Sequence, residues 1–84
     1  MSEYMIAFSS FYKAVYAQEK AQEKNVWATL KKTPPGILKS CGYALYFKTD
    51  DVRGLVEFLD QSLIDNRGVY RIAREAGETT YQPV

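Results

Sequence analysis

The single cysteine of the chain is the side chain with the clearest potential for chemistry. Cys41 lies in the stretch KSCG, residues 39–42, shortly after a turn with two prolines, and the 84 residues contain no histidine. A thiolate is a nucleophile whose reactivity depends on a lowered pKa and on access to the sulfur. Without histidine there is no triad chemistry, and one cysteine argues against a tetrahedral zinc site within one chain. We therefore consider thiol chemistry at Cys41 with no metal and no other cofactor.

The composition indicates one small cytoplasmic domain. The formal net charge is only +1, so we expect no broad electrostatic surface for nucleic acid or anionic lipid. No apolar run approaches the roughly 20 residues that a membrane helix needs, and the N-terminus does not resemble a signal peptide. One cysteine cannot form a disulfide within the chain, which fits a reducing compartment. We expect a cytoplasmic protein that does not bind membranes.

Hydrophobic patterns predict six elements within residues 1–74, which we take as one domain. Strands are expected at 4–8, 26–31, 43–47 and 69–73, and helices at 11–25 and 52–63. N-cap signals precede the helices, at Ser9 and Ser10 for the first and at Thr49 for the second. This order predicts a ferredoxin-like βαββαβ two-layer sandwich, with an antiparallel sheet in the order 4-1-3-2. Residues 75–84 are expected to form a polar, mobile tail.

This topology predicts a location for Cys41. The connection that contains Cys41, the start of the first helix and the turn that contains Arg67 would all lie at one edge of the sheet. A helix N-terminus offers unpaired N–H groups and partial positive charge, which lower the pKa of a nearby thiol. Serines beside Cys41 would donate hydrogen bonds to it, Lys39 and Arg67 would add positive charge, and Gly42 would leave space for a reaction partner. The predicted site consists of Cys41, Ser9, Ser10, Lys39, Ser40, Gly42 and Arg67.

Five short motifs carry a resemblance to a known family. They are Phe8-Ser9-Ser10, the helix residues Ala14 and Ala17, the prolines Pro34 and Pro35, Ser40-Cys41-Gly42 followed by Ala44, Leu45 and Phe47, and Gly68-Val69-Tyr70-Arg71. In this order and spacing they resemble a family of very small bacterial selenium or sulfur carrier-like proteins, over residues 3–72. The resemblance implies a carrier rather than an enzyme. Cys41 would hold sulfur or selenium, as a persulfide or selenosulfide, between a donor protein and an acceptor protein.

The chain departs from the family at the start of the first helix. Members often carry polar residues, histidine among them, where this chain has Phe11 and Tyr12. No general base is therefore expected here, and a carrier needs none, because a thiolate of low pKa attacks the donor's sulfur directly.

An interaction module is a second interpretation. Trp27, Tyr46 and Tyr70 cannot all pack beneath two short helices, so we expect some of them on the open face of the sheet, where they would form an interface. The simplest partner is a second copy of the chain, and Cys41 would then be an incidental, buried residue.

An RNA-recognition domain is a third and less favoured interpretation. Residues 41–47 partly match the third strand of such domains. However, Leu45 replaces a stacking aromatic residue and the chain lacks a basic excess, so we do not expect nucleic acid as the partner.

Overall fold

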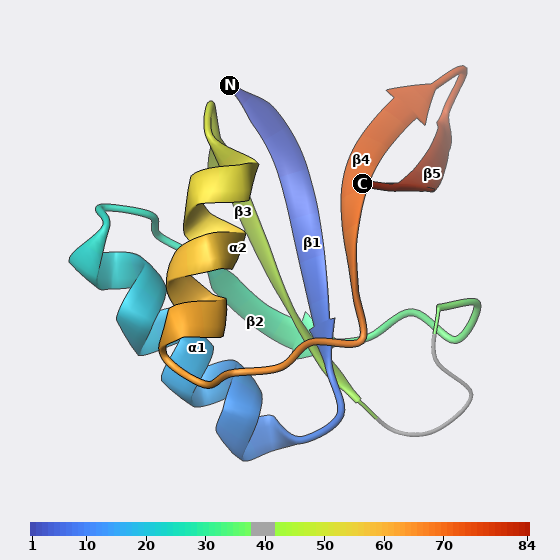
Figure 1. Cartoon of the computed structure of the whole chain (residues 1–84). Helices are drawn as coiled ribbons and strands as arrows, with labels where there is room; N and C mark the ends of the chain where they lie inside the picture. Colours follow the sequence, from blue (N-terminus) through green and yellow to red (C-terminus); the bar gives the residue numbers. More distant parts are fainter. Residues whose placement is uncertain (38–41) are drawn as a thin grey trace.

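The computed structural model describes residues 1–37 and 42–84 and forms one α+β domain (Figure 1). Its elements, in chain order, are β1 (Ser2–Phe8), α1 (Phe11–Glu23), β2 (Thr29–Lys32), β3 (Tyr43–Thr49), α2 (Val52–Gln61), β4 (Gly68–Glu75) and β5 (Glu78–Pro83). The five strands form a single sheet in the order β2-β3-β1-β4-β5, and every neighbouring pair is antiparallel. The predicted α+β class with an antiparallel sheet is confirmed.

The prediction of four strands was wrong, because the sheet has a fifth strand. We expected the order 4-1-3-2 and a polar tail at 75–84, but β5 lies within that segment and pairs with β4 from Tyr70–Pro83 to Glu75–Glu78. Ala76 and Gly77 close this hairpin with positive φ angles of 50° and 82°. A two-residue turn with both φ angles positive matches the twist of an antiparallel hairpin, which explains why the polar segment forms a strand.

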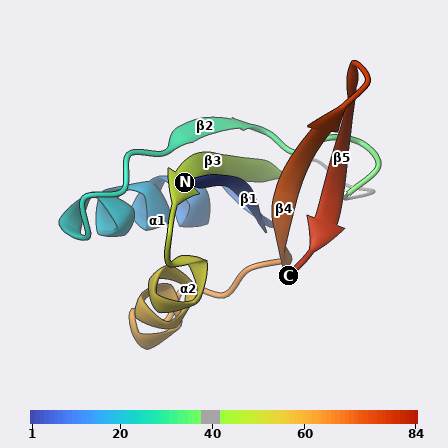
Figure 2. The same ribbon diagram turned by 90° about the horizontal axis from the view of Figure 1, so that it is seen from above.

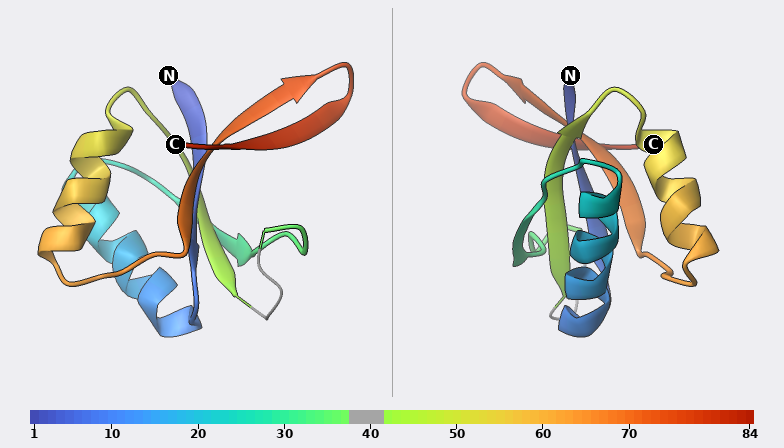
Figure 3. Two further views of the ribbon diagram at one scale, coloured as in Figure 1. Left: turned by 45° about the vertical axis from the view of Figure 1, so that its right-hand side comes forward. Right: turned by 90° about the vertical axis from the view of Figure 1, so that its left-hand side faces the viewer.

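The two faces of the sheet have different coverings. Both helices lie on one face, and the β4–β5 hairpin bends away from them (Figures 2 and 3). Alternate residues of β1 follow this division: Ile6 and Phe8 pack in the core beneath the helices, whereas Met5 packs with Ala44 and Ile72 on the opposite side. We call this second side the helix-free face. Strand alternation therefore gives the sheet a large core on one face and a small one on the other.

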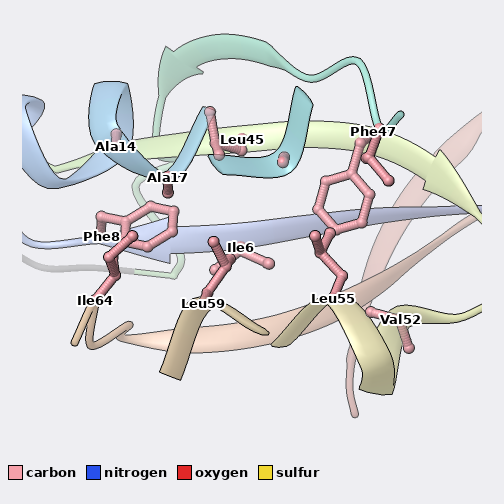
Figure 4. Packing of buried hydrophobic residues seen from close by; sticks show 12 residues of the cluster. Ile6, Phe8, Ala14, Ala17, Leu45, Phe47, Val52, Leu55, Leu59 and Ile64 are labelled. Atoms are coloured by element: carbon pink, nitrogen blue, oxygen red, sulfur yellow. The ribbon is translucent and has the colours of Figure 1, made fainter. Parts of the chain in front are cut away.

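The large core positions α1 against the sheet. Ala14, Ala17 and Ala21 are at most 1% exposed, as their helical spacing predicted, and these small side chains let α1 approach the strands closely. On the same face of the sheet, α2 contributes Leu55 and Leu59 to this cluster (Figure 4). Alternate strand residues and two apolar helix faces thus build one continuous core.

The start and end of α2 differ from the sequence-based expectation. Asp51, not Thr49, is the N-cap, and its carboxylate accepts a hydrogen bond of 3.0 Å from the N–H of Gly54. A Cβ atom at Gly54 would lie 2.3 Å from a carboxylate oxygen of Asp51, so a glycine at this position allows the close cap. At the other end Leu63 lies beyond the helix and is 92% exposed, and Ile64 is the buried residue instead.

Candidate functional site

The entry to β3 and the start of α1 lie at the same end of the sheet. Phe8, the last residue of β1, pairs with Tyr43, and Gly42 directly precedes Tyr43. Gly42 is buried, and its carbonyl accepts a hydrogen bond of 2.9 Å from the N–H of Thr33. The rings of Phe11 and Tyr43 pack edge to face with centroids 5.1 Å apart. The chain on either side of this edge is therefore held by backbone pairing and by aromatic packing.

The connection from α2 to β4 reaches the same edge. The N–H of Arg67 donates a hydrogen bond of 2.7 Å to the carbonyl of Ala7, and Gly68 is the β4 partner of Ala7. The Arg67 side chain is exposed. The residues that the structure brings together here are Ser9, Ser10, Gly42 and Arg67, and we call this edge the β1 rim.

The N-terminus of α1 gives the β1 rim a positive electrostatic end. Ser10 is the N-cap, and its hydroxyl oxygen accepts a hydrogen bond of 3.2 Å from the N–H of Lys13. The amides of Phe11 and Tyr12, earlier in the first turn, have no partner within the helix. The first turn contains no acidic residue that would offset the partial positive charge of the helix end. The β1 rim is therefore suited to an anion.

The fixed charges near the β1 rim are the cations of Lys13 and Arg67 and the carboxylate of Asp65. The ammonium group of Lys13 lies 2.7 Å from a carboxylate oxygen of Asp65, and this hydrogen bond lowers the pKa of the Asp65 carboxyl below its ordinary value. These two charges offset each other. Among the described residues, no acidic side chain lies within ion-pair distance of Arg67. The charge of Arg67 also helps to lower the pKa of the Asp65 carboxyl, so two cations lie near one carboxylate at this edge.

Part of the predicted site lies outside the described residues. Cys41, Lys39 and Ser40 belong to residues 38–41, so their predicted placement beside Ser9, Ser10, Gly42 and Arg67 stays a prediction. In the part of the chain that the structure describes, no group of three or more His, Cys, Asp or Glu side chains could hold a metal ion. Within the same residues, neither helix is long and apolar enough to cross a bilayer.

The aromatic residues predicted for an interface all lie on the helix-free face. Tyr46 and Tyr70 are partly buried and pack against Met5 and its neighbours in the small core. Trp27 is 71% exposed and precedes β2, which begins at Thr29 and not, as predicted, at residue 26. Their role as an interface stays a prediction.

The helix-free face carries a groove that the sequence did not indicate. It has a volume of about 620 Å³ and is bordered on one side by Trp27 and on the other by the β4–β5 hairpin, through Arg74 and Tyr81. Between them lies Tyr46, whose pKa is raised to about 12 because its ring is partly buried and because it lies next to Tyr81. We call this concavity the helix-free groove. No sequence signal indicated it, because it exists only once the hairpin has folded.

The protein is thus a small α+β domain with a five-stranded antiparallel sheet and two helices on one face. The edge of the sheet at the start of α1, the β1 rim, is suited to an anion. The model of the family described as "Putative Se/S carrier protein-like" matches residues 3–71. The chain belongs to this family, as its motifs indicated. Comparison with curated proteins and with solved structures finds no match.

Proposed function

We propose that the protein carries sulfane sulfur or selenium on Cys41, as a persulfide or a selenosulfide. The observation that carries this proposal is the match to the carrier-like family over residues 3–71, a range that contains the only cysteine of the chain. The family description names the cargo in coarse terms only. The assignment of the cargo to Cys41 is our inference, because a thiolate is the side chain here that can accept a sulfane sulfur atom.

The β1 rim supports this proposal. Cys41 directly precedes Gly42 in the chain, and Gly42 lies at the edge where the first turn of α1 presents free amides. Arg67 adds a cation at the same edge. A positive environment of this kind stabilises a thiolate and also a persulfide anion, and it lowers the pKa of the thiol.

The transfer needs no cofactor and no external oxidant. The Cys41 thiolate attacks the outer sulfur of a donor persulfide, the S–S bond of the donor breaks, and a new S–S bond forms on Cys41 while the donor leaves as a thiolate. A nucleophile on the acceptor then attacks the outer sulfur of the Cys41 persulfide and releases the Cys41 thiolate. The oxidation level of the transferred atom is unchanged, and selenium follows the same path. Such chemistry requires a reducing compartment, so we propose a cytoplasmic location.

We expect the intact mass of the protein to rise by one sulfur atom after incubation with a cysteine desulfurase and cysteine, or by one selenium atom with a selenocysteine lyase and selenocysteine. The gain should be absent in Cys41→Ser and should disappear from the parent protein after treatment with a reducing thiol. A parent protein that gains neither atom would contradict the carrier function. The alternative, a binding module with an incidental cysteine, would then remain, provided that Cys41→Ser folds normally.

We expect the Cys41 thiol to titrate below its ordinary pKa of about 8.5, because the end of α1 and Arg67 favour the thiolate. The measurement is the rate of reaction with a thiol reagent as a function of pH. Arg67→Gln should move the apparent pKa upward, whereas Arg53→Gln, on the exposed surface of α2, is the matched control and should leave it unchanged. An apparent pKa at or above that of a free thiol would argue against an activated cysteine.

We also infer that β1 to β4 with the two helices represent the ferredoxin-like unit that the sequence suggested, to which β5 is an addition at one edge. The supporting observation is the succession β2-β3-β1-β4 within the five-stranded sheet.

A further inference from the structure

We propose that the helix-free groove binds single-stranded nucleic acid. This inference goes beyond the carrier function and does not depend on Cys41. It rests on three observations about the groove: the indole ring of Trp27 is exposed, its cations outnumber its anions, and its walls come from three separate parts of the sheet.

The groove is built by strand alternation. Every second residue from Trp27 into β2 lines the groove, namely Trp27, Thr29 and Lys31. The alternating residues Ala28 and Leu30 pack toward the helices. Tyr46 and Lys48 are alternate residues of β3, and both line the groove. On the far side the hairpin, which bends away from the helices, contributes Arg74 and Tyr81 (Figure 3). The result is an open channel rather than a closed pocket.

Charge on the groove differs from charge on the whole chain. The net charge of the protein is +1, and seven of its ten acidic residues lie on the helices or in their flanking connections: Glu19, Glu23, Asp50, Asp51, Glu57, Asp60 and Asp65. The groove itself holds the cations Lys31, Lys48 and Arg74 against the single carboxylate of Glu3, which pairs with Arg74. Lys31 and Lys48 are exposed, and no described acidic side chain lies within ion-pair distance of either; Glu3, which pairs with Arg74, is also the cross-strand neighbour of Lys48. The small net charge therefore conceals a positive groove.

The aromatic residues of the groove suit nucleobases. Trp27 is 71% exposed, so a base can stack on its indole ring. The ammonium group of Lys31 lies 5.4 Å from the centre of the Tyr46 ring, which places a phosphate-binding cation beside an aromatic surface. An exposed ring with cations beside it matches the arrangement that binds single strands without sequence preference, in which bases stack on aromatic side chains and cations follow the backbone.

The same charges disfavour two other occupants. In a face-to-face pair of two copies, the positive groove of one chain would lie against the positive groove of the other, and like charges in an interface oppose association. An acidic peptide would satisfy the cations but would leave the exposed indole of Trp27 without a stacking partner. Single-stranded nucleic acid supplies both the phosphates and the planar rings.

The test is titration with a fluorescein-labelled oligouridylate of about 12 nucleotides, a length within the site sizes of known single-strand binders. Trp27 is the only tryptophan, so its fluorescence reports on the groove directly and should be quenched, while the anisotropy of the label rises. Because three cations would contact phosphates, a plot of the logarithm of the binding constant against the logarithm of the salt concentration should have a slope of about −2. Cys41→Ser should bind as the parent protein does, which separates this test from that of the carrier function.

A matched pair of double variants places the binding in the groove. Lys31→Glu/Lys48→Glu should weaken binding at least about tenfold, because it reverses two phosphate contacts. Lys32→Glu/Arg53→Glu changes the net charge equally but lies outside the groove, and it should bind within about twofold of the parent protein. Equal losses in both double variants would overturn the proposal, as would an absence of quenching at low salt. Competition by polyglutamate as strong as that of unlabelled oligouridylate, or a dimer in size-exclusion chromatography that Trp27→Lys dissociates, would also overturn it.

Discussion

Phe8→Ala is expected to lower the free energy of unfolding by about 3–5 kcal/mol, the range for truncation of a buried phenylalanine. Phe8 is fully buried beneath the helices, at the end of β1, and it packs in the cluster that contains Ala14 and Ile64 (Figure 4). Truncation would leave a cavity at the point where α1, β1 and β3 meet. A domain of 84 residues has a total stability of only about 4–13 kcal/mol, so this one change can unfold much of the population.

Denaturant unfolding of Phe8→Ala and of the parent protein measures this loss. Tyr12→Ala is the matched control, because the Tyr12 side chain is 84% exposed, and its effect should stay within about 0.5 kcal/mol. Phe8→Leu should recover most of the loss, since it keeps an apolar side chain of nearly the same volume. A loss below about 1 kcal/mol for Phe8→Ala would contradict the packing described for this core.

The core-forming elements could be predicted because their sequence pattern and their packing agree. The apolar runs that became β1 and β3 place alternate residues in the main core, and the alanines of α1 recur at helical spacing. The joint position of the α1 start, Gly42 and Arg67 followed from strand order alone. In these elements the apolar periodicity and the local preferences favour the same structure, so the sequence predicts the element correctly.

The fifth strand could not be predicted, because its segment lacks the usual local signals. Residues 78–83 read ETTYQP, a polar run that ends in proline, and only Tyr81 among them packs against the small core. Ala76 has a left-handed conformation in the turn. Asparagine or aspartate is the usual residue at this position of a two-residue hairpin turn and would have indicated the hairpin. Pairing with β4 across the two-residue turn stabilises this strand, so its formation depends on the neighbouring strand rather than on an apolar pattern of its own.

The helix-free groove was missed for the same reason. Its outer wall belongs to the hairpin, so Arg74 and Tyr81 were not expected near Trp27. The net charge gave no sign of the groove's cations, because it sums over faces that the fold keeps apart. The N-cap of α2 could not be chosen from the sequence, because Thr49, Asp50 and Asp51 are consecutive residues that can all cap a helix. Asp51 is the cap in the structure, and Gly54 leaves room for its carboxylate.

Gly68→Ala is expected to lower the free energy of unfolding by about 2 kcal/mol or more, through backbone strain and a steric clash together. Gly68 has a φ angle of 143°, a conformation that L side chains rarely adopt. A Cβ atom there would lie 2.7 Å from ring atoms of Tyr70, which cannot move freely because its ring packs in the small core on the helix-free face. The N–H of Gly68 also donates a hydrogen bond of 2.9 Å to the side chain of Asn66, which fixes this turn.

The same change should disturb the β1 rim, since Gly68 pairs with Ala7 directly after Arg67. We therefore expect Gly68→Ala to raise the apparent pKa of the Cys41 thiol as well as to lower stability, because Arg67 would move away from the end of α1. Gly36→Ala is the matched control: nothing lies within 4 Å of a Cβ atom at that position, so stability should change by less than about 0.5 kcal/mol. If Gly68→Ala unfolds like the parent protein, the strained turn does not hold β4 against β1. If only the thiol pKa fails to move, Arg67 does not act on the thiol, and the end of α1 alone must account for any activation.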